Sequence, residues 1–368
     1  MLVTLEDKIR RYGRSIGIDL IGFTTAAPFL RIGEVQQQRL EMNCLSGFEE
    51  QDIEKRVNPL LTMENTKSII AIGIGYYHKD ERSVEEAHGE IARTAWGRDY
   101  HYVLMDKLLR LMEYIKKNTG EFEYKAFVDT GPLSDREVAY RAGLGWFGKN
   151  NMFITEDYGS WVFLGYALTN LSLMPDQPII ESCLQCNLCI EACPGRALKD
   201  GYNMNARKCM SYVTQTKEEI DEETRGKMKN FIYGCDVCQN VCPHNKHIVH
   251  KTEGDFIPEG NTHRPSIRKL IQMSNKEFKV LYKNTAAGWR GKNYLRRNAI
   301  IAAGNTKNPG LLLYLAEVLK DESVMIRKYA VWAIHKIGGE GKDILRKHLL
   351  LEKDQEIITE ITKCLEGD

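Results

Sequence analysis

The sequence predicts a multidomain protein of mixed α+β or α/β class in three consecutive parts. An α/β domain is expected at residues 1–175, a cysteine-rich domain at 176–262 and a domain of helical repeats at 263–368. Strand and helix patterns alternate in the first part, two cysteine runs occupy the second, and the third contains an internal repeat. The chain has 368 residues, 43% of them hydrophobic, which is enough to build several cores.

The first part contains uninterrupted apolar runs and one long amphipathic stretch. Residues 102–117 place apolar side chains on one face of a helix. A second helix should begin at Ser134, because Glu137 follows at the spacing of a capping box. Strands are expected at 19–23, 68–76, 124–128 and 161–168.

Asp129 follows the strand at 124–128, at the sheet edge where α/β domains bind ligands. A carboxyl group held in an apolar pocket there would have a raised pKa and could donate a proton. An aspartate that only forms the turn fits the segment equally well. His78 and His101 stand alone in the sequence, which favours surface or hydrogen-bonded residues over metal ligands.

The C-terminal part repeats a helical pattern. Residues 295–303 resemble residues 326–334, which begin 31 positions later, and 357–365 form a weaker echo. Helix pairs at this period predict a short HEAT-like stack. Two unrelated amphipathic helices are the alternative, and the shared small residues favour the repeat.

Eight of the ten cysteines form two runs that are typical of a pair of [4Fe–4S] clusters. The first run, Cys-x2-Cys-x2-Cys-x3-Cys-Pro, has the bacterial ferredoxin spacing, in which the fourth cysteine ligates the other cluster. The second run lacks one ligand, and Cys209 is the spare cysteine nearby. Zinc is disfavoured, because it prefers two separated Cys-x2-Cys pairs. One cluster is therefore expected on Cys183, Cys186, Cys189 and Cys242, and the other on Cys193, Cys209, Cys235 and Cys238.

Charge and hydropathy limit the location and the partners. The formal net charge is +1, and no apolar run is long enough to span a membrane. Clustered cysteines that bind metal fit a reducing compartment, so we expect a cytoplasmic protein without a membrane partner. Residues 263–298 nevertheless carry ten lysines and arginines against one acid, Glu277. This local excess favours a phosphate-binding surface over a solvated helix face.

Several longer segments together resemble the epoxyqueuosine reductases, which complete the modified tRNA base queuosine. They cover nearly the whole chain in order: Ser46-Gly-Phe-Glu-Glu with Lys55-Arg-Val, 95–101, 128–150, both cysteine runs, 209–217, 233–239 and 289–292.

The resemblance implies an oxidoreductase with cobalamin in the N-terminal domain and two [4Fe–4S] clusters that supply its electrons. The reaction would remove the epoxide oxygen and leave an alkene, with Asp129 as proton donor. Ala92 stands where some relatives carry cysteine, so no thiolate ligand to cobalt is expected. The implied cobalamin contacts are Arg56, Ala92, Asp129, Phe153, Leu164 and Ser211.

The resemblance also implies a partner, the anticodon stem-loop of a queuosine tRNA. We further expect a monomer that takes electrons from a small reducing protein or another low-potential donor. A cobalamin- and iron–sulfur-dependent reductase of small molecules, similar to reductive dehalogenases, is one alternative, and an electron-transfer module without catalysis is another. The first does not need the helical repeats or the basic segment, and the second would need neither the Asp129 loop nor a large cofactor domain. The expected tRNA contacts are Lys217, Arg290, Lys292, Arg296 and Arg297.

Overall fold

The structure, a computed structural model, describes residues 3–79, 87–199, 203–251 and 254–366. The chain divides into two compact units whose segments interleave in sequence. Unit 1 comprises residues 1–79, 99–209 and 237–255, and unit 2 comprises 80–98, 210–236 and 256–368. The expected domain boundaries at residues 175 and 262 cut the chain into consecutive parts, whereas the two units interleave in sequence. These domain boundaries stay predictions.

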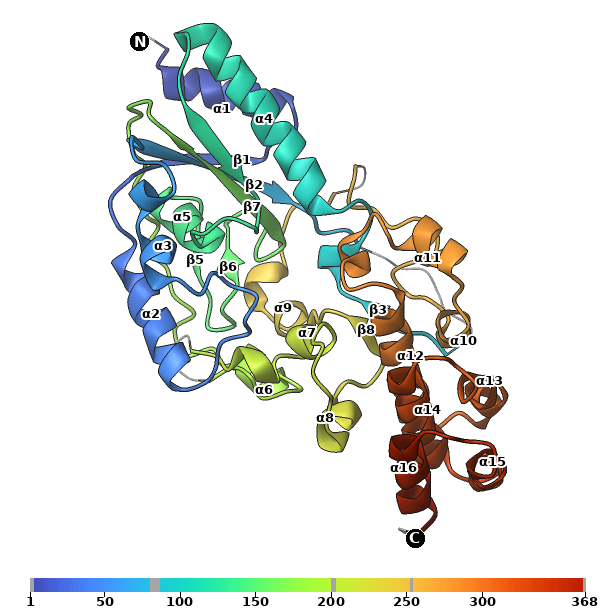
Figure 1. Cartoon of the computed structure of the whole chain (residues 1–368). Coiled ribbons are helices and arrows are strands. Elements are labelled where there is room, and N and C mark those ends of the chain that lie inside the picture. The colour runs from blue at the N-terminus through green and yellow to red at the C-terminus, as the bar shows by residue number, and fades with distance from the viewer. Residues whose placement is uncertain (1–2, 80–86, 200–202, 252–253, 367–368) are drawn as a thin grey trace. The chain divides into compact units, whose positions relative to one another are not determined.

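Unit 1 is built on a four-stranded antiparallel sheet in the order β1-β2-β7-β4 (Figure 1). Every residue of β2 is buried, as its unbroken apolar run predicted. All four expected strands are present. Because each pairing is antiparallel, α+β describes this unit and α/β does not. The strands are β1 (Leu20–Thr25), β2 (Ser68–Gly75), β4 (Tyr124–Phe127) and β7 (Val162–Thr169).

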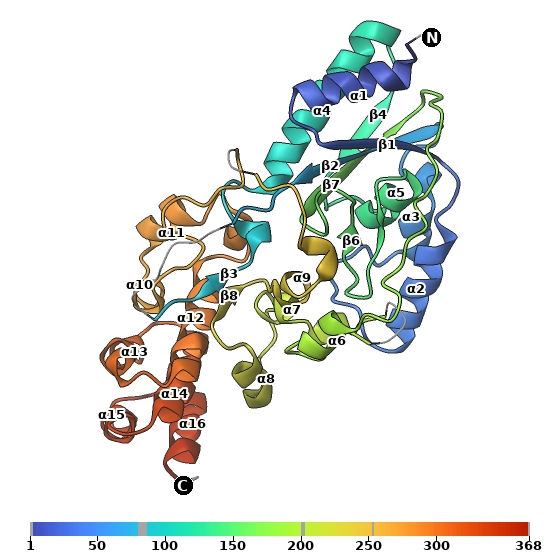
Figure 2. The same ribbon diagram turned by 180° about the vertical axis from the view of Figure 1, so that it is seen from behind.

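Helices cover both faces of this sheet (Figures 1 and 2). The amphipathic helix α4 (Tyr100–Thr119) packs against β7 and against α1 (Leu5–Ser15). The short helix α5 (Asp135–Arg141) packs against β1, β2 and β7. Smaller elements complete the unit: α2 (Leu30–Glu41), α3 (Ile53–Val57), β5 (Trp146–Phe147), β6 (Phe153–Ile154), α6 (Leu188–Ala192) and α9 (Val237–Asn240).

The capping box expected at Ser134 is not formed. Ser134 is the N-cap of α5, but its side chain makes no capping hydrogen bond. Glu137 is instead 3% exposed and forms an ion pair with Arg31 of α2. A buried carboxylate gains more from a guanidinium than from one backbone amide, so the tertiary contact prevails over the local motif.

Unit 2 consists of stacked helices and a small parallel strand pair. Strand β3 (Glu90–Ile91) pairs with β8 (Phe231–Tyr233), which packs on α12 (Lys292–Thr306). Helix α12 packs on α14 (Val324–Ile337), and α14 packs on α16 (Gln355–Glu366), so the three repeat copies form one layer (Figure 1). The other helices are α7 (Met210–Val213), α8 (Glu222–Lys227), α10 (Ile267–Ile271), α11 (Asn275–Leu281), α13 (Leu312–Val318) and α15 (Gly341–Leu349).

The stack confirms the predicted repeat, and small residues explain its close packing. A Cβ atom on Gly304 would lie 2.8 Å from the Trp332 ring and 3.0 Å from Ala333 Cα. Helices α12 and α14 therefore approach closely at this point, as the shared small residues predicted. Within the described ranges, no helix is both long and apolar enough to cross a membrane. Short 3₁₀ turns occur at Pro59–Leu61, Arg93–Ala95, Ala206–Lys208, Pro243–Asn245, Ala286–Gly288 and Pro309–Leu311.

Candidate active site

Asp129 lies in the loop between β4 and α5, in a backbone conformation that is unusual for aspartate. Its φ is +59°, in the left-handed region. Its N–H donates to Asp135 Oδ2 at 2.7 Å, and Thr130 N–H donates to Val128 O at 2.7 Å. The first residue of α5 thus holds the loop, while the Asp129 side chain remains 65% exposed.

The start of α4 supplies two partners for the Asp129 carboxylate. Tyr100 Oη donates to Asp129 Oδ2 at 2.8 Å, and His101 Nε2 lies 3.6 Å from the same oxygen. The other ring nitrogen of His101 lies 2.6 Å from Asp99 Oδ1. Tyr100 stacks on Phe163 of β7, with ring centroids 4.3 Å apart, so the sheet fixes the position of this helix end.

The proton of this network belongs to His101. Burial alone would lower the pKa of His101, but hydrogen bonds to Asp129 and Asp99 outweigh it and raise the pKa to about 9. Partial desolvation by the surrounding protein would raise the pKa of Asp129, but hydrogen bonds from His101 and Tyr100 hold it below its ordinary value. The hypothesis that an apolar pocket raises the pKa of Asp129 is therefore wrong, because its surroundings are charged and polar.

A second carboxyl group, Asp135, lies beneath Asp129. Burial and the negative charge of Asp129 raise the pKa of Asp135 to about 7, against the opposing effects of Arg56 and Arg136. Arg56 Nη1 donates to Pro132 O at 3.1 Å, and Arg136 donates to Asn151 O. One acid, Asp135, and two arginines thus support the loop from below.

The sequence missed the partners of Asp129. Tyr100 and His101 precede it by about 30 positions, and only the sheet order brings them to it. His101 was expected to be a surface or hydrogen-bonded residue, and it is hydrogen-bonded. The available signal was Asp99, which caps the first turn of the helix predicted to follow it.

The expected cobalamin contacts in unit 1 surround the same loop or lie in the core. Arg56 is on α3. Phe153 and Leu164 are 2% and 8% exposed and belong to one core cluster with Tyr166. Arg56 Nε and Asn150 Nδ2 are among the buried donor atoms of this unit that have no hydrogen-bond partner within the described part of the chain.

Ala92 and Ser211, the other two expected contacts, belong to unit 2. Ala92 N–H already donates to Tyr233 O at 2.8 Å, so its amide is not available to a cofactor. Its carbonyl accepts from Ala95 N–H and retains a second lone pair. Ser211 is partly exposed on α7, where its Oγ accepts from Gln215 Nε2 at 3.3 Å.

The cysteines expected to hold the first cluster gather in unit 1. Burial, and then the neighbouring Cys183 and Cys242, raise the pKa of Cys189 to about 11. Burial also raises the pKa of Cys242, which has Cys183 and Cys186 among its neighbours. Helix α6 packs against α9, which brings the two cysteine runs together. This electrostatic coupling supports the first predicted ligand set.

Backbone amides point at two of the thiols. Lys149 N–H lies 3.5 Å from Cys183 Sγ, and Ala197 N–H lies 3.3 Å from Cys193 Sγ. No three His, Cys, Asp or Glu residues in the described ranges are placed to hold a single metal ion. The second set, Cys193, Cys209, Cys235 and Cys238, draws on both units and stays a prediction.

The basic segment divides into buried and exposed residues, and this corrects two expected tRNA contacts. Arg297 is fully buried and donates to the carbonyl oxygens of Val213, Thr214 and Thr216. Arg296 is 8% exposed and pairs with Asp321 at 2.8 Å. Both guanidinium groups are engaged inside unit 2, so they cannot contact a phosphate.

The other expected tRNA contacts reach the surface of unit 2. Lys217 is exposed, and Arg290 and Lys292 are partly exposed. The guanidinium of Arg290 stacks 3.7 Å from the ring centroid of Trp289, which is 51% exposed. Exposed lysines of the same segment are Lys269, Lys276, Lys279 and Lys283.

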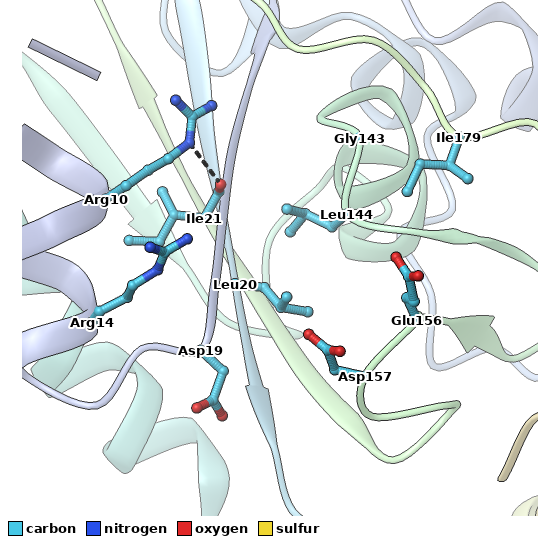
Figure 3. Close-up of a pocket in the computed structure, with 10 residues that line it drawn as sticks. All are labelled: Arg10, Arg14, Asp19, Leu20, Ile21, Gly143, Leu144, Glu156, Asp157 and Ile179. Carbon is cyan, nitrogen blue, oxygen red and sulfur yellow. Dashed lines mark hydrogen bonds between the residues drawn. The ribbon is translucent and has the colours of Figure 1, made fainter. Parts of the chain in front are cut away.

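A polar pocket in unit 1 is lined by α1, the start of β1 and residues 143–144, 156–157 and 179 (Figure 3). Arg10 and Arg14 reach into it from α1, and Arg10 Nε donates to Ile21 O at 3.4 Å. Arg10 also pairs with Asp176, and Asp19 pairs with Lys251. Arg10 and Asp19 are thus neutralised within the protein, and none of the expected site residues lines the pocket.

Comparison with known proteins gives consistent matches along the chain. Family models match residues 56–130 (epoxyqueuosine reductase QueG, DUF1730), 182–245 (4Fe-4S double cluster binding domain) and 290–366 (HEAT repeats). The epoxyqueuosine reductase of Bacillus anthracis is 42% identical over 98% of this chain and 97% of its own. That of Escherichia coli is 31% identical over 99% and 97%.

Solved structures agree with these relatives. A crystal structure of epoxyqueuosine reductase with an epoxyqueuosine-modified tRNA-Tyr stem loop is 42% identical and covers 98% of each chain, with a TM-score of 0.94. A Bacillus subtilis epoxyqueuosine reductase, whose catalytic aspartate loop is swung out of its active site, gives a TM-score of 0.93.

The chain combines a double-cluster domain with an acid–histidine pair on an α+β fold. This combination defines an iron–sulfur oxidoreductase. Identity of 42% over nearly the full length decides the family. The chain belongs to the epoxyqueuosine reductases. This confirms the resemblance, the oxidoreductase activity and the iron–sulfur clusters, and it removes the case for a small-molecule dehalogenase or a non-catalytic module.

Proposed function

We propose that this chain removes the epoxide oxygen of epoxyqueuosine within tRNA, with Asp129 delivering a proton and cobalamin bound beside the Asp129 loop. The observation that carries the proposal is the Asp129 carboxylate, which is exposed yet held by Tyr100 and His101. An acid in an enzyme must be both positioned and accessible, and this side chain meets both conditions.

The acid–histidine pair suits the oxygen that leaves. Conversion of an epoxide to an alkene consumes two electrons and two protons and releases water. Cleavage of the first C–O bond leaves a strongly basic oxygen, which needs a proton. At neutral pH the pair stores one proton on His101, and Asp129 can relay it to the substrate, since the pKa of His101 is about 9. The second proton comes from solvent.

The residues around the loop fit cobalamin. When bound, cobalamin supplies a strongly reducing, nucleophilic metal centre. Its rim carries amide carbonyl groups, which accept hydrogen bonds. The buried, unsatisfied donors Arg56 Nε and Asn150 Nδ2 are the complementary groups, and buried donors without partners are rare in folded proteins. Phe153 and Leu164 are almost completely buried, so they belong to the apolar core of unit 1 and not to an open wall of the cofactor site.

The tRNA partner rests on two observations. A relative at 42% identity has been crystallised with an epoxyqueuosine-modified stem loop. In this chain, Lys217, Arg290 and Lys292 present positive charge at the surface of unit 2, and phosphates are bound by such side chains. Arg296 and Arg297 take no part, because both are buried.

Mass spectrometry of the tRNA base tests the proposal. Epoxyqueuosine-containing tRNA is incubated anaerobically with the full-length protein, reconstituted with iron, sulfide and cobalamin and reduced with dithionite. We expect the base to lose one oxygen atom. An unchanged base, with both clusters and cobalamin present, would refute the proposed function. Protein without cobalamin serves as the control and should leave the base unchanged.

A further inference from the structure

Three large apolar side chains are exposed on the segment that carries the first cysteines. Ile180 is 91% exposed, Leu184 81% and Leu188 46%. Leu184 directly follows Cys183, and Leu188 directly precedes Cys189. Four residues of chain span at most about 14 Å, so Leu184 and Leu188 are exposed within a short distance of each other on this segment. Single exposed apolar residues are common, but a group of them marks an interaction site.

The backbone conformation of Leu184 supports an interaction site on this segment. Its φ is +45°, in the left-handed region where glycine and asparagine are favoured. The turn is closed by a hydrogen bond from Cys186 N–H to Cys183 O at 3.0 Å. A leucine there is strained, and its exposed side chain recovers little of that cost by packing within unit 1. A role outside the chain explains why this position carries a leucine.

The four cysteines expected to hold the first cluster differ in burial. Cys189 and Cys242 are buried, and Cys242 packs with Trp146, Ile154 and the partly buried Ile179. Cys183 and Cys186 are only partly buried, on the turn that carries Leu184. Electrons that enter a cluster on these four thiols have their shortest path from solvent at this turn.

The electron demand of the reaction indicates what class of electron donor would bind here. Each epoxide consumes two electrons, and a [4Fe–4S] cluster passes them one at a time. An external donor must therefore reduce the protein repeatedly. A small reductant needs no apolar surface, whereas a carrier protein must hold its own centre close to the cluster through a small, transient interface. Glu181, Glu191 and Arg196 are exposed on the same segment and supply the polar rim that such interfaces have.

We propose that Ile180, Leu184 and Leu188 form the docking surface for a small one-electron carrier protein that reduces the first cluster. The inference rests on the proposed function. At each encounter the carrier loses one electron and the cluster gains one, and two encounters with two protons convert one epoxide to an alkene and water. The apolar side chains exclude water between the two redox centres.

The test compares two electron donors on the full-length, reconstituted protein. The variant Leu184→Asn with Leu188→Gln removes the apolar surface, and asparagine tolerates the left-handed backbone at 184. With reduced flavodoxin as the carrier, we expect KM for flavodoxin to rise about tenfold, as loss of an interface anchor typically produces. Turnover driven by dithionite, and the iron content, should stay at the wild-type values.

A matched control is Leu313→Gln on α13, a leucine that is 69% exposed in unit 2. It should leave KM for flavodoxin unchanged. The docking proposal is overturned if KM for flavodoxin does not change in the double variant, if both donors slow equally with clusters intact, or if KM for tRNA rises instead, which would make this surface an RNA contact. Failure of the wild-type protein with dithionite would refute the proposed function itself, so the two failures are distinguishable.

Discussion

Asp129 and Arg297 are both charged residues that the sequence predicted to contact a ligand. Asp129 lies in a loop, and Arg297 lies in a helix. The side chain of Asp129 is 65% exposed, whereas Arg297 is completely buried. Asp129 lies in a turn at the end of a strand, where the backbone directs it outward. Arg297 lies within the buried stretch of α12, which runs from Leu295 to Gly304. The difference teaches that charge alone does not predict exposure, because a helix enclosed on all sides buries even its arginines.

The largest effect on turnover is expected for a variant of Asp129, the exposed residue of this pair. Asp129→Asn keeps the shape of the side chain but cannot relay the proton of His101. General acid catalysis contributes about 10²–10⁴-fold, so turnover should fall by about that factor. Iron content and cobalamin binding should be preserved. Turnover close to that of wild type, measured by mass spectrometry of the tRNA base, would remove Asp129 from the mechanism.

The next prediction concerns the buried member. Arg297→Met removes a donor from three carbonyl oxygens at the end of α7 and just after it, of which only Thr214 O keeps another donor among the described residues, Asn298 Nδ2. We expect the free energy of unfolding to fall by about 3 kcal/mol, because each unsatisfied buried group costs about 1–3 kcal/mol and partial relaxation limits the sum. Urea titration measures the change. If the free energy of unfolding is unchanged while tRNA affinity falls, Arg297 contacts the tRNA and is not an internal structural residue.

The pH dependence of turnover sharpens the assignment of the proton to His101. Because the pKa of His101 is raised to about 9, the pair keeps its proton at pH 7–8 and loses it above about 9. We expect kcat/KM to fall above that pH. Asp99→Asn should move this limb to lower pH, since one of the two carboxylates that raise the pKa is gone while asparagine still caps α4. An unmoved limb would assign it to another group.

The smallest effects are expected at the exposed lysines. Lys217→Ala and Lys292→Ala should each weaken tRNA binding a few-fold and reduce the slope of log affinity against log salt by about 1, the effect of one lost phosphate contact. Filter binding at several salt concentrations measures both quantities. Lys8→Ala, an exposed lysine of α1 in unit 1, is the control and should change neither. Equal effects of all three variants would indicate unspecific attraction.

Much of the fold could be predicted because its signals are local. The unbroken apolar run of β2 and the heptad-like face of α4 each encode one element through neighbouring residues. The repeat of α12 in α14 could be read because stacked helices need small residues at equivalent positions. The capping box at Ser134 failed for the opposite reason: Arg31, about 100 positions away, competes for Glu137.

The sequence by itself determined the cysteine spacing, the strands, the helical repeat and, through its resemblance, the family. These features depend on contacts within a few residues or on patterns that a metal cluster imposes on the chain. The tertiary structure alone decided that the sheet is antiparallel, that His101 and Tyr100 hold Asp129, and that Arg296 and Arg297 are internal. The physical reason is that burial and pKa depend on which distant segments pack around a side chain, and no local pattern encodes those neighbours.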